Sequence, residues 1–467
     1  MFSLITGVQP DMYKPWKGEK MTINQNQSFL PCMNYKQLQK FRQQVYELLN
    51  FAQDATFELT DAVLTTRNVY SLADFSLSPF FRRKWPSIYE ALQDCRPNRN
   101  KLMRLYIKQI PAQERPVLAV DHTAWTRLHS PTLQDRTYSH QPSAIASNKP
   151  ISVGQGYSTI AWIPEQSGSW ALPLRHERIT SWENPISKAV WQIKQVCKYL
   201  PLRPMILLDS EYGNASLLNQ TDEIEADFLM RIRSNRCLYS APGPYTGKGR
   251  PRKHGQKFKL NDSSTWWEAT STVEVEDSKL GLLRVRMWQD LHFSGSATHA
   301  MQLILIERIL PEESLSKPQP LWLVWLGEKM PTLTEIWQQY LRRFAVDHWY
   351  RFLKQRLHWT VPQLSTPQQA ERWSDLMPIL SWELWLARDL VAQHHLPWQK
   401  PLSHLTPGRV AQSIALLLPQ IGTPTVSPKP RGKSPGWQVG NKRTKKTRYP
   451  VVKKGKTSHK KRTKKSA

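Results

Sequence analysis

Two aspartates stand where a folded sheet would present a reactive carboxylate. Asp121 follows the apolar run 116–120, and Asp209 follows the apolar run 205–208. In open α/β sheets, ligands gather beyond the carboxyl ends of the strands, where a side chain is held rigidly and still reaches solvent. Asp is also a favoured residue at the start of a helix, so helix capping is the competing interpretation of each aspartate taken alone.

A third set of polar residues falls on one side of a helix that we predict over 334–357. Tyr340, Arg343, Asp347 and Lys354 follow one another at steps of three, four and seven residues, which places them within an arc of roughly 60°. Most surrounding positions are apolar, so we expect the helix to be buried on most sides. Buried charges are costly unless they are paired or bound to a metal, so this stripe predicts either a structural ladder of ion pairs or an active-site wall.

The stripe resembles the tyrosine–arginine–glutamate–lysine signature of the DDE transposases of bacterial insertion sequences. Residues 340–355 resemble the third catalytic block of that family, residues 118–123 (LAVDHT) its first and residues 207–213 (LLDSEYG) its second. The resemblance covers about residues 115–360. One position departs from the family, because Asp347 stands where Glu is usual; it keeps the charge and shortens the side chain by one methylene.

The resemblance implies that Asp121, Asp209 and Asp347 are the catalytic residues and the ligands of two Mg²⁺ ions, for which Mn²⁺ would substitute. Two such ions can activate a water or 3′-hydroxyl nucleophile and stabilise the leaving oxygen of a phosphodiester. It further implies a homodimer that binds paired ends of a mobile element, cleaves the DNA and joins the 3′ ends to target DNA. The contacts to the DNA backbone that it implies are Tyr340, Arg343 and Lys354.

Two other functions stay open. One is a transposase-derived DNA-binding protein without cleavage activity, which the Asp at position 347 keeps in consideration. The other is a hydrolytic nuclease of the same fold. Metal-dependent nicking would exclude the first alternative, and joining of a cut end to target DNA would exclude the second.

A basic loop and several tryptophans offer further DNA contacts. Arg250, Arg252 and Lys253 lie in a Pro/Gly-constrained stretch that resembles a minor-groove hook, although a flexible charged loop has the same composition. Trp125 and the pair at 266–267 could stack on unpaired bases, but tryptophans more often belong to a core.

The elements that must position these residues change character along the chain. Apolar runs alternate with a helical pattern at 184–199, which is typical of a mixed α/β sheet buried on both faces. Segment 175–177 (Arg-His-Glu) follows one predicted strand and is a weaker candidate for the same face as the aspartates.

The fold class that we predict is α/β: a ribonuclease-H-like mixed sheet core with a β-rich insertion, a helical N-terminal domain and a disordered basic tail. The predicted divisions are 1–35, irregular; 36–110, helical and possibly DNA-binding; 115–234, first part of the core; 235–330, the β-rich insertion; 331–420, helical completion of the core; and 421–467, the disordered basic tail.

Length and composition exclude several classes of protein. The chain has 467 residues, 40% of them apolar and 20 of them Trp, so it can bury a large core and is not globally disordered. No apolar stretch approaches the ~18 residues that cross a bilayer, and residues 1–10 lack a signal-peptide pattern. The cysteines form no CxxC pair, so neither a zinc site nor a disulfide framework is indicated. We therefore expect a cytoplasmic protein with no membrane partner and no small-molecule cofactor, and the resemblance implies a bacterial, nucleoid-associated one.

The charge indicates a polyanionic partner. Lys and Arg number 65 against 37 Asp and Glu, a net charge of +28. Residues 429–467 contain 16 of these cations and no acid, which leaves a surplus of 12 on the rest of the chain. Because both the body and the tail are basic, nucleic acid is the simplest partner.

Overall fold

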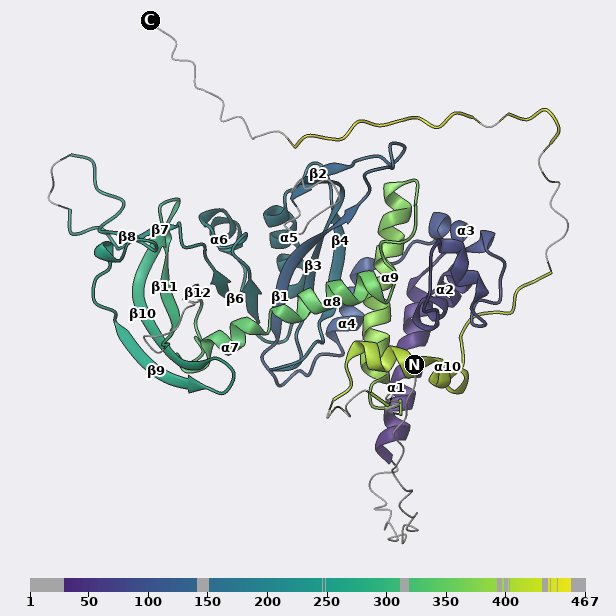
Figure 1. Ribbon diagram of the computed structural model, residues 1–467, viewed down its shortest axis with the longest axis horizontal. Coiled ribbons are helices and arrows are strands. Elements are labelled where there is room, and N and C mark those ends of the chain that lie inside the picture. Colours follow the sequence, from purple (N-terminus) through teal and green to yellow (C-terminus); the bar gives the residue numbers. More distant parts are fainter. Residues whose placement is uncertain are drawn as a thin grey trace, which may run out of the picture.

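The computed structural model describes most of the chain. The described residues are 29–140, 151–245, 247, 249–310, 319–392, 397–398, 402, 404–430, 436, 438–442 and 444–454. Most of the predicted segment 1–35 therefore lies outside the described residues. In Figure 1 a twisted sheet runs through the molecule, with a strand-rich end on the left and a helical end on the right.

Five strands form the central part of the sheet. Their order is β4-β3-β1-β5-β6, with β3 antiparallel to β1 and β4, and with β5 and β6 parallel to β1. This mixed α/β arrangement is consistent with the ribonuclease-H-like core that the resemblance implies. The strands are β1 (Val117–Thr126), β3 (Ile151–Trp162), β4 (Leu172–Ile179), β5 (Met205–Leu208) and β6 (Asp227–Arg231).

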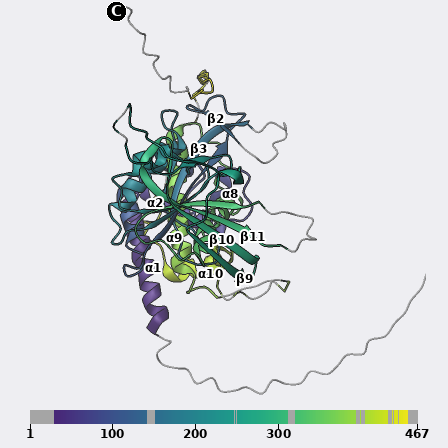
Figure 2. The same ribbon diagram turned by 90° about the vertical axis from the view of Figure 1, so that its left-hand side faces the viewer.

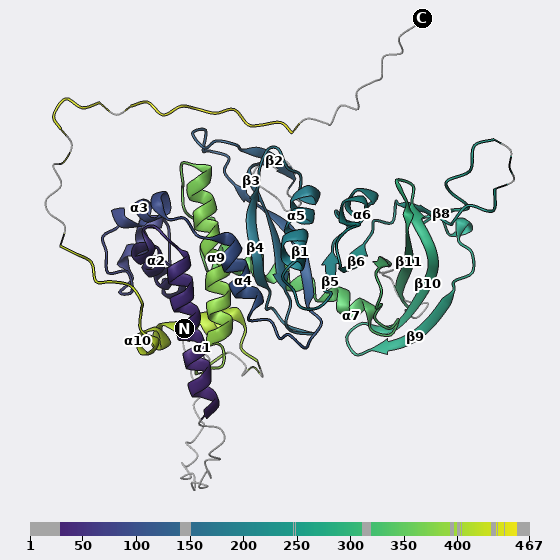
Figure 3. The same ribbon diagram turned by 180° about the vertical axis from the view of Figure 1, so that it is seen from behind.

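Helices cover both faces of this central sheet. On β3, Ser158 Oγ donates a hydrogen bond to Gln192 in α5 (Pro185–Cys197), whereas the next residue, Thr159, accepts one from Tyr350 in α8 (Phe344–Gln355). Successive side chains of a strand point to opposite faces, so α5 and α8 lie on opposite sides of the sheet. Figure 1 shows α8 in front of β1, and Figure 3 shows the α5 side from behind.

The strands of residues 235–330 extend the same sheet. β12 pairs with the free edge of β6, which makes the described sheet one of 12 strands; Figure 2 faces its β9–β11 end. An exposed strand edge is a row of unpaired backbone groups, and β12 satisfies those of β6. The added strands are β7 (Cys237–Tyr239), β8 (Lys257–Lys259), β9 (Ser271–Asp277), β10 (Gly281–Phe293), β11 (Ser296–Arg308) and β12 (Leu321–Leu326), and β2 (Thr137–His140) lies at the other end.

Helices from the two ends of the chain pack together. The long helix α9 contacts β4 on one side and α1, α2, α3 and α10 on the other. The boundary that we predict between an N-terminal helical domain and the rest stays a prediction. The helices and the 3₁₀ helix η2 are α1 (Phe29–Leu48), α2 (Gln53–Thr65), η2 (Leu72–Leu77), α3 (Pro86–Asp94), α4 (Arg99–Ile107), α6 (Ala215–Thr221), α9 (Pro367–Ala387) and α10 (Pro407–Ile421).

A buried ion cluster joins three of these helices. Arg42 of α1 donates two hydrogen bonds to Asp61 of α2, at 2.8 and 2.9 Å, and also bonds Glu383 of α9. The three residues are 2%, 3% and 1% exposed. Burial raises the pKa of Asp61, and the Arg42 charge opposes this rise. One cation thus serves two buried carboxylates at the centre of the helical end.

The helix that we predicted over 334–357 is two helices. α7 (Ile336–Leu341) ends at Leu341 and α8 begins at Phe344, and the bond from Val346 N to Arg343 O (3.0 Å) is a three-residue, 3₁₀-type bond. Leu341 and Phe344 are 38% and 43% exposed, so the expectation of burial on most sides is wrong at this junction.

Part of the tail that we expected to be disordered contacts the folded body. Arg82 of the α2–α3 connection donates to the carbonyl of Thr425 (3.2 Å), and Tyr449 and Val452 bond to the backbone at and before β2. No helix among the described residues is long and apolar enough to cross a membrane.

Candidate active site

The sheet register brings Asp121 and Asp209 together. The parallel ladder between β1 and β5 ends at the pair Val120–Leu208, so each aspartate occupies the next position of its strand. Neighbouring strands are roughly 4.8 Å apart, and parallel strands end at the same edge of a sheet. The two carboxyl groups therefore start from adjacent backbone positions, as the sequence indicated.

The strand that carries Asp121 does not stop there. We expected the apolar run to end at this residue, but β1 continues to Thr126 because it pairs with β3, where Asp121 lies opposite Thr159. Asp121 is thus the point at which β1 passes the end of the shorter strand β5. This position explains how the residue can be 9% exposed and still border an open edge.

Helix capping does not account for Asp209. The helix after β5 is α6, and its first turn is capped by Asn214, whose Oδ1 accepts bonds from Ser216 N and Leu217 N. Asp209 Oδ1 accepts one bond, from Glu211 N (2.9 Å). Gly213 lets the connecting turn pass against β6, because a Cβ there would meet the Arg231 carbonyl at 2.2 Å. The turn therefore holds Asp209 in place without using it as a helix cap.

Arg343 links two of the three aspartates. Its Nη1 lies 3.2 Å from Asp121 Oδ2, and its Nη2 lies 3.5 Å from Asp347 Oδ2. The Arg343 side chain is 9% exposed and that of Asp347 is 47% exposed. Asp347 is therefore an exposed residue on the first turn of α8, next to Arg343.

The other two residues of the stripe lie on either side of Arg343. Tyr340 is 2% exposed, and burial raises its pKa while the neighbouring Arg343 opposes the rise. Lys354 Nζ donates to Thr123 Oγ1 (2.7 Å), which fastens α8 to β1 two residues beyond Asp121, and burial lowers its pKa. The stripe is an ion-paired ladder at its centre, and it also borders the aspartates.

Burial is the main influence on the charge of Asp121. Burial raises the pKa of Asp121 to about 6, Arg343 opposes this rise, and the charge of Asp209 adds to it. Oxygen ligands in a negatively charged pocket are what Mg²⁺ prefers, so Asp121 and Asp209 fit a divalent cation. Within the described residues, no group of three or more His, Cys, Asp or Glu side chains is close enough to hold a metal ion. Asp347 is grouped with Arg343 instead.

Residues other than the predicted catalytic set border this site. His122 Nδ1 lies 3.0 Å from Tyr212 Oη, and its Nε2 lies 3.4 Å from Glu211 Oε2, so β1 and the turn after β5 are joined beside the aspartates. Arg231 follows Met230, the partner of Leu208, and is therefore level with Asp209. His122, Glu211 and Tyr212 fall inside the two segments that carry the resemblance; only pairing between strands identifies Arg231.

Other predicted contacts lie away from the aspartates. Arg250, Arg252 and Lys253 are in the exposed connection between β7 and β8, at the far end of the sheet from β1. Trp125 is 1% exposed and donates to the Thr360 carbonyl, so it belongs to the core. The tryptophans at 266–267 pack on the core around β8.

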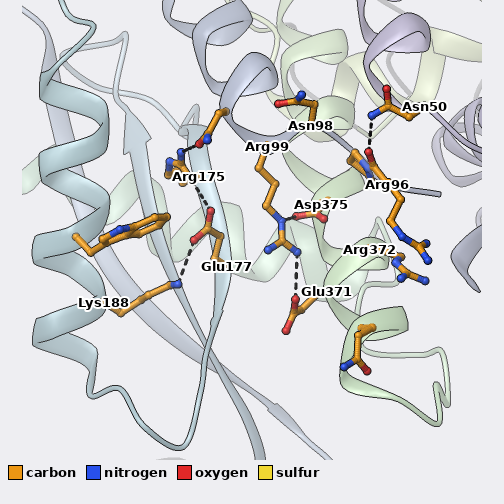
Figure 4. Close-up of a pocket in the computed structure, with 14 residues that line it drawn as sticks. Asn50, Arg96, Asn98, Arg99, Arg175, Glu177, Lys188, Glu371, Arg372 and Asp375 are labelled. Atoms are coloured by element: carbon orange, nitrogen blue, oxygen red, sulfur yellow. Dashed lines mark hydrogen bonds and ion pairs between the residues drawn. The ribbon is translucent and has the colours of Figure 1, made fainter. Parts of the chain in front are cut away.

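A hollow of about 640 Å³ lies beside β4 (Figure 4). Most of its charged side chains are paired with one another: Arg99 Nε lies 2.7 Å from Asp375 Oδ1, and Lys188 Nζ lies 3.2 Å from Glu177. Arg96 and Arg372 donate to backbone carbonyls instead. Arg99 also contacts Glu371 (3.3 Å). These pairs connect α4, α5, α9 and β4. The hollow is an ion-paired junction between elements rather than a set of free ligands.

This hollow corrects the expectation for residues 175–177. Arg175 and Glu177 line it and pair with each other at 2.6 Å, so they do not lie beside the aspartates. His176 points to the other face, where it packs on Trp349 and Trp359, and burial lowers its pKa to about 3. It is a neutral core residue at physiological pH.

Asp375 makes this junction sensitive to pH. Burial raises its pKa to about 7, whereas the unfolded value is ~4, so the folded chain binds the proton more tightly. The stabilisation from this proton is fully present below pH ~4 and is lost as pH rises through about 7. We expect the thermal unfolding temperature, relative to that of Asp375→Asn, to fall between pH 5 and 8. A difference that stays constant across this range would contradict the assignment.

Comparison with known proteins identifies the family of the chain. The model of the family described as DDE superfamily endonuclease matches residues 44–289, more than half of the chain. The match contains Asp121 and Asp209 and ends before Asp347. No curated protein matches the sequence.

Proposed function

Because the chain belongs to the DDE superfamily of endonucleases, we propose that it is a transposase that cleaves DNA at the ends of its mobile element and joins the 3′ ends to target DNA. Family membership makes DNA the substrate class. The observation that carries the proposal is the β1–β5 register, which sets Asp121 beside Asp209 at one sheet edge inside the matched region.

The residues at this edge divide the work of the reaction. Asp121 and Asp209 would hold divalent metal, with Mg²⁺ as the expected ion; when bound, it activates the nucleophile and stabilises the leaving oxygen. Arg343 keeps the Asp121 carboxylate in place and balances part of its charge. Lys354 and Tyr340 border the same edge, and the lysine cation offers a contact to a DNA phosphate.

Asp347 is our choice for the third acidic residue. It is exposed, it lies on α8 next to Arg343, and it occupies the signature position of the stripe. To act with the other two aspartates, it must exchange its contact with Arg343 for one with metal. The alternative, a DNA-binding protein that does not cleave, is favoured by this same Arg343–Asp347 contact.

Substitutions of Asp347 separate these two functions. We expect Asp347→Glu to cleave within about tenfold of the wild type, because Glu keeps the charge and reaches one methylene further, and Asp347→Asn to lose at least roughly 10²-fold. The measurement is the single-turnover cleavage rate of DNA carrying the element end. If the Asn variant cleaves as fast as the Glu variant, Asp347 is not the third acid.

The direct test of the proposal is a cleavage and joining assay. The full chain is incubated with its own element end in Mg²⁺, in Mn²⁺ and with a chelator. Cleavage in either metal that the chelator abolishes, followed by joining of the cut 3′ end to a target plasmid, supports a transposase. Cleavage without joining supports a hydrolytic nuclease, and binding without cleavage supports the non-cleaving alternative.

Further parts of the proposal concern assembly and DNA contacts. A homodimer on paired ends would give native mass measurements of two chains per two DNA ends. The basic loop with Arg250, Arg252 and Lys253 is exposed at the end of the sheet, which suits a DNA contact remote from the cleaved phosphate. A location in the bacterial cytoplasm with the nucleoid stays a prediction.

A further inference from the structure

One segment of the basic tail bonds to the outer strand of the sheet through its backbone. The N–H of Tyr449 donates to the Pro131 carbonyl and the N–H of Val452 donates to the Arg136 carbonyl, both at 2.8 Å. Val452 also forms a parallel bridge with Thr137, the first residue of β2. β2 is the last strand at this end of the sheet, so the tail covers an edge that would otherwise be open.

A buried arginine reinforces this attachment. Arg136 is 5% exposed, and its Nη2 donates to the Tyr449 carbonyl (3.3 Å). Its Nη1 donates to the carbonyls of Arg127 (3.3 Å) and Leu128 (3.2 Å). The guanidinium thus joins the tail to the connection that follows β1. We call residues 444–454 the docked segment.

The docked segment lies toward the same ends of the strands as the aspartates. Thr126 of β1 and Thr137 of β2 both pair with Gly154, so they are level with each other along the sheet. Thr126 is five residues beyond Asp121, roughly 17 Å at ~3.3 Å per residue. Along the strands the docked segment is therefore roughly 17 Å beyond Asp121. It also lies three strand spacings of ~4.8 Å to the side of β1, so the separation is roughly 22 Å; in Figure 1 the yellow tail passes above β2.

The docked segment presents positive charge to solvent. Lys445, Lys446, Arg448 and Lys453 are exposed, and the segment contains no acidic residue. Lys454 Nζ donates to the Glu183 carbonyl (2.6 Å), which fastens the end of the segment to the connection between β4 and α5. The bonds of Tyr449 and Val452 anchor the backbone next to Arg448 and Lys453, so these cations can contact phosphates near a defined position, unlike cations on a free tail.

We propose that the docked segment is a DNA-binding strand that holds the phosphate backbone of the substrate about six base pairs from the cleaved phosphate. B-DNA rises ~3.4 Å per base pair, so roughly 22 Å corresponds to about six pairs. This inference rests on the proposed function for its substrate and adds a fixed place and a role for the tail. A tail that is not bonded to β2 would bind along the DNA without a preferred position.

The test detaches the segment without changing its charge. Val452→Pro removes the N–H that donates to Arg136 and keeps every Lys and Arg. Thr447→Pro is the matched control, because the Thr447 N–H donates to no other described residue. Both are made in the full chain with Asp209→Asn, which prevents cleavage, and are bound to element-end DNA for hydroxyl-radical footprinting and affinity measurement.

We expect protection of the backbone about six base pairs from the cleavage position in the parent chain and in Thr447→Pro. Val452→Pro loses this protection and binds roughly five- to tenfold more weakly. Replacing Lys445, Lys446 and Arg448 by Gln has the same effect and lowers the slope of log affinity against log salt by roughly 2–3, at ~0.9 per phosphate contact. Unchanged thermal unfolding of Val452→Pro shows that the body is folded.

The outcomes separate this inference from the function on which it rests. Protection and affinity of Val452→Pro equal to those of Thr447→Pro would overturn the docked strand. A chain with native Asp209 that cleaves DNA without protection at that position overturns it too, and leaves the proposed function standing. If Val452→Pro removes the protection but the chain with native Asp209 never cleaves DNA with metal, the docked strand is supported and the transposase function is overturned.

Discussion

Asp209→Asn lowers the single-turnover rate of DNA cleavage by at least roughly 10³-fold and leaves DNA binding intact. Asn preserves the shape of the side chain and its bond from Glu211 N, but it removes the negative charge beside Asp121. A divalent cation then loses one of its two adjacent carboxylates. The loss should also weaken the dependence of the residual rate on metal concentration.

A matched control separates this effect from a general loss of acidic charge. Asp222 follows α6, its side chain is 75% exposed, and it contacts His299 at 3.0 Å. Asp222→Asn should cleave at the wild-type rate. Cleavage by Asp209→Asn within threefold of the wild type would remove Asp209 from the catalytic set.

Arg42→Met destabilises the folded chain by about 3–5 kcal/mol. The substitution leaves Asp61 and Glu383 buried without their shared cation, at 3% and 1% exposure. Because burial already raises the pKa of Asp61 against the effect of Arg42, loss of the arginine raises it further and drives proton uptake. The measurement is the urea midpoint at pH 7, and the loss should be smaller at pH 5, where the carboxylates accept protons more readily.

A surface arginine provides the comparison. Arg284 and its partner Glu274 are 47% and 49% exposed, so water screens the pair. Arg284→Met should cost less than about 1 kcal/mol. If the two substitutions destabilise the chain equally, the buried cluster contributes no more than a surface pair.

Local sequence was sufficient for the parts of the site that depend on local pattern. The apolar run before Asp209 forms β5 over the four residues that we predicted, because its length and composition already indicate a strand buried on both faces. The spacing of Tyr340, Arg343, Asp347 and Lys354 indicated one shared side, and Arg343 and Lys354 do reach β1.

Contacts between distant segments determined the features of the site that the local pattern did not predict. The extension of β1 to Thr126 depends on β3, more than 25 residues away. Because the residues directly after Asp121 are polar, a search for apolar runs does not detect this extension. The break between α7 and α8 at residues 342–343 has no proline or glycine to mark it. Asp347 is exposed because this break and the contact with Arg343 orient the first turn of α8.

The sequence by itself determined the family resemblance, the two aspartates at one sheet edge and the demand for a polyanionic partner. Residue type, spacing and total charge are properties of the chain alone. Only the tertiary structure decided that β12 joins β6, that Arg136 holds the tail against β2, and that Arg343 reaches Asp121. Each is a hydrogen bond or ion pair between residues at least 90 positions apart, which no local pattern encodes.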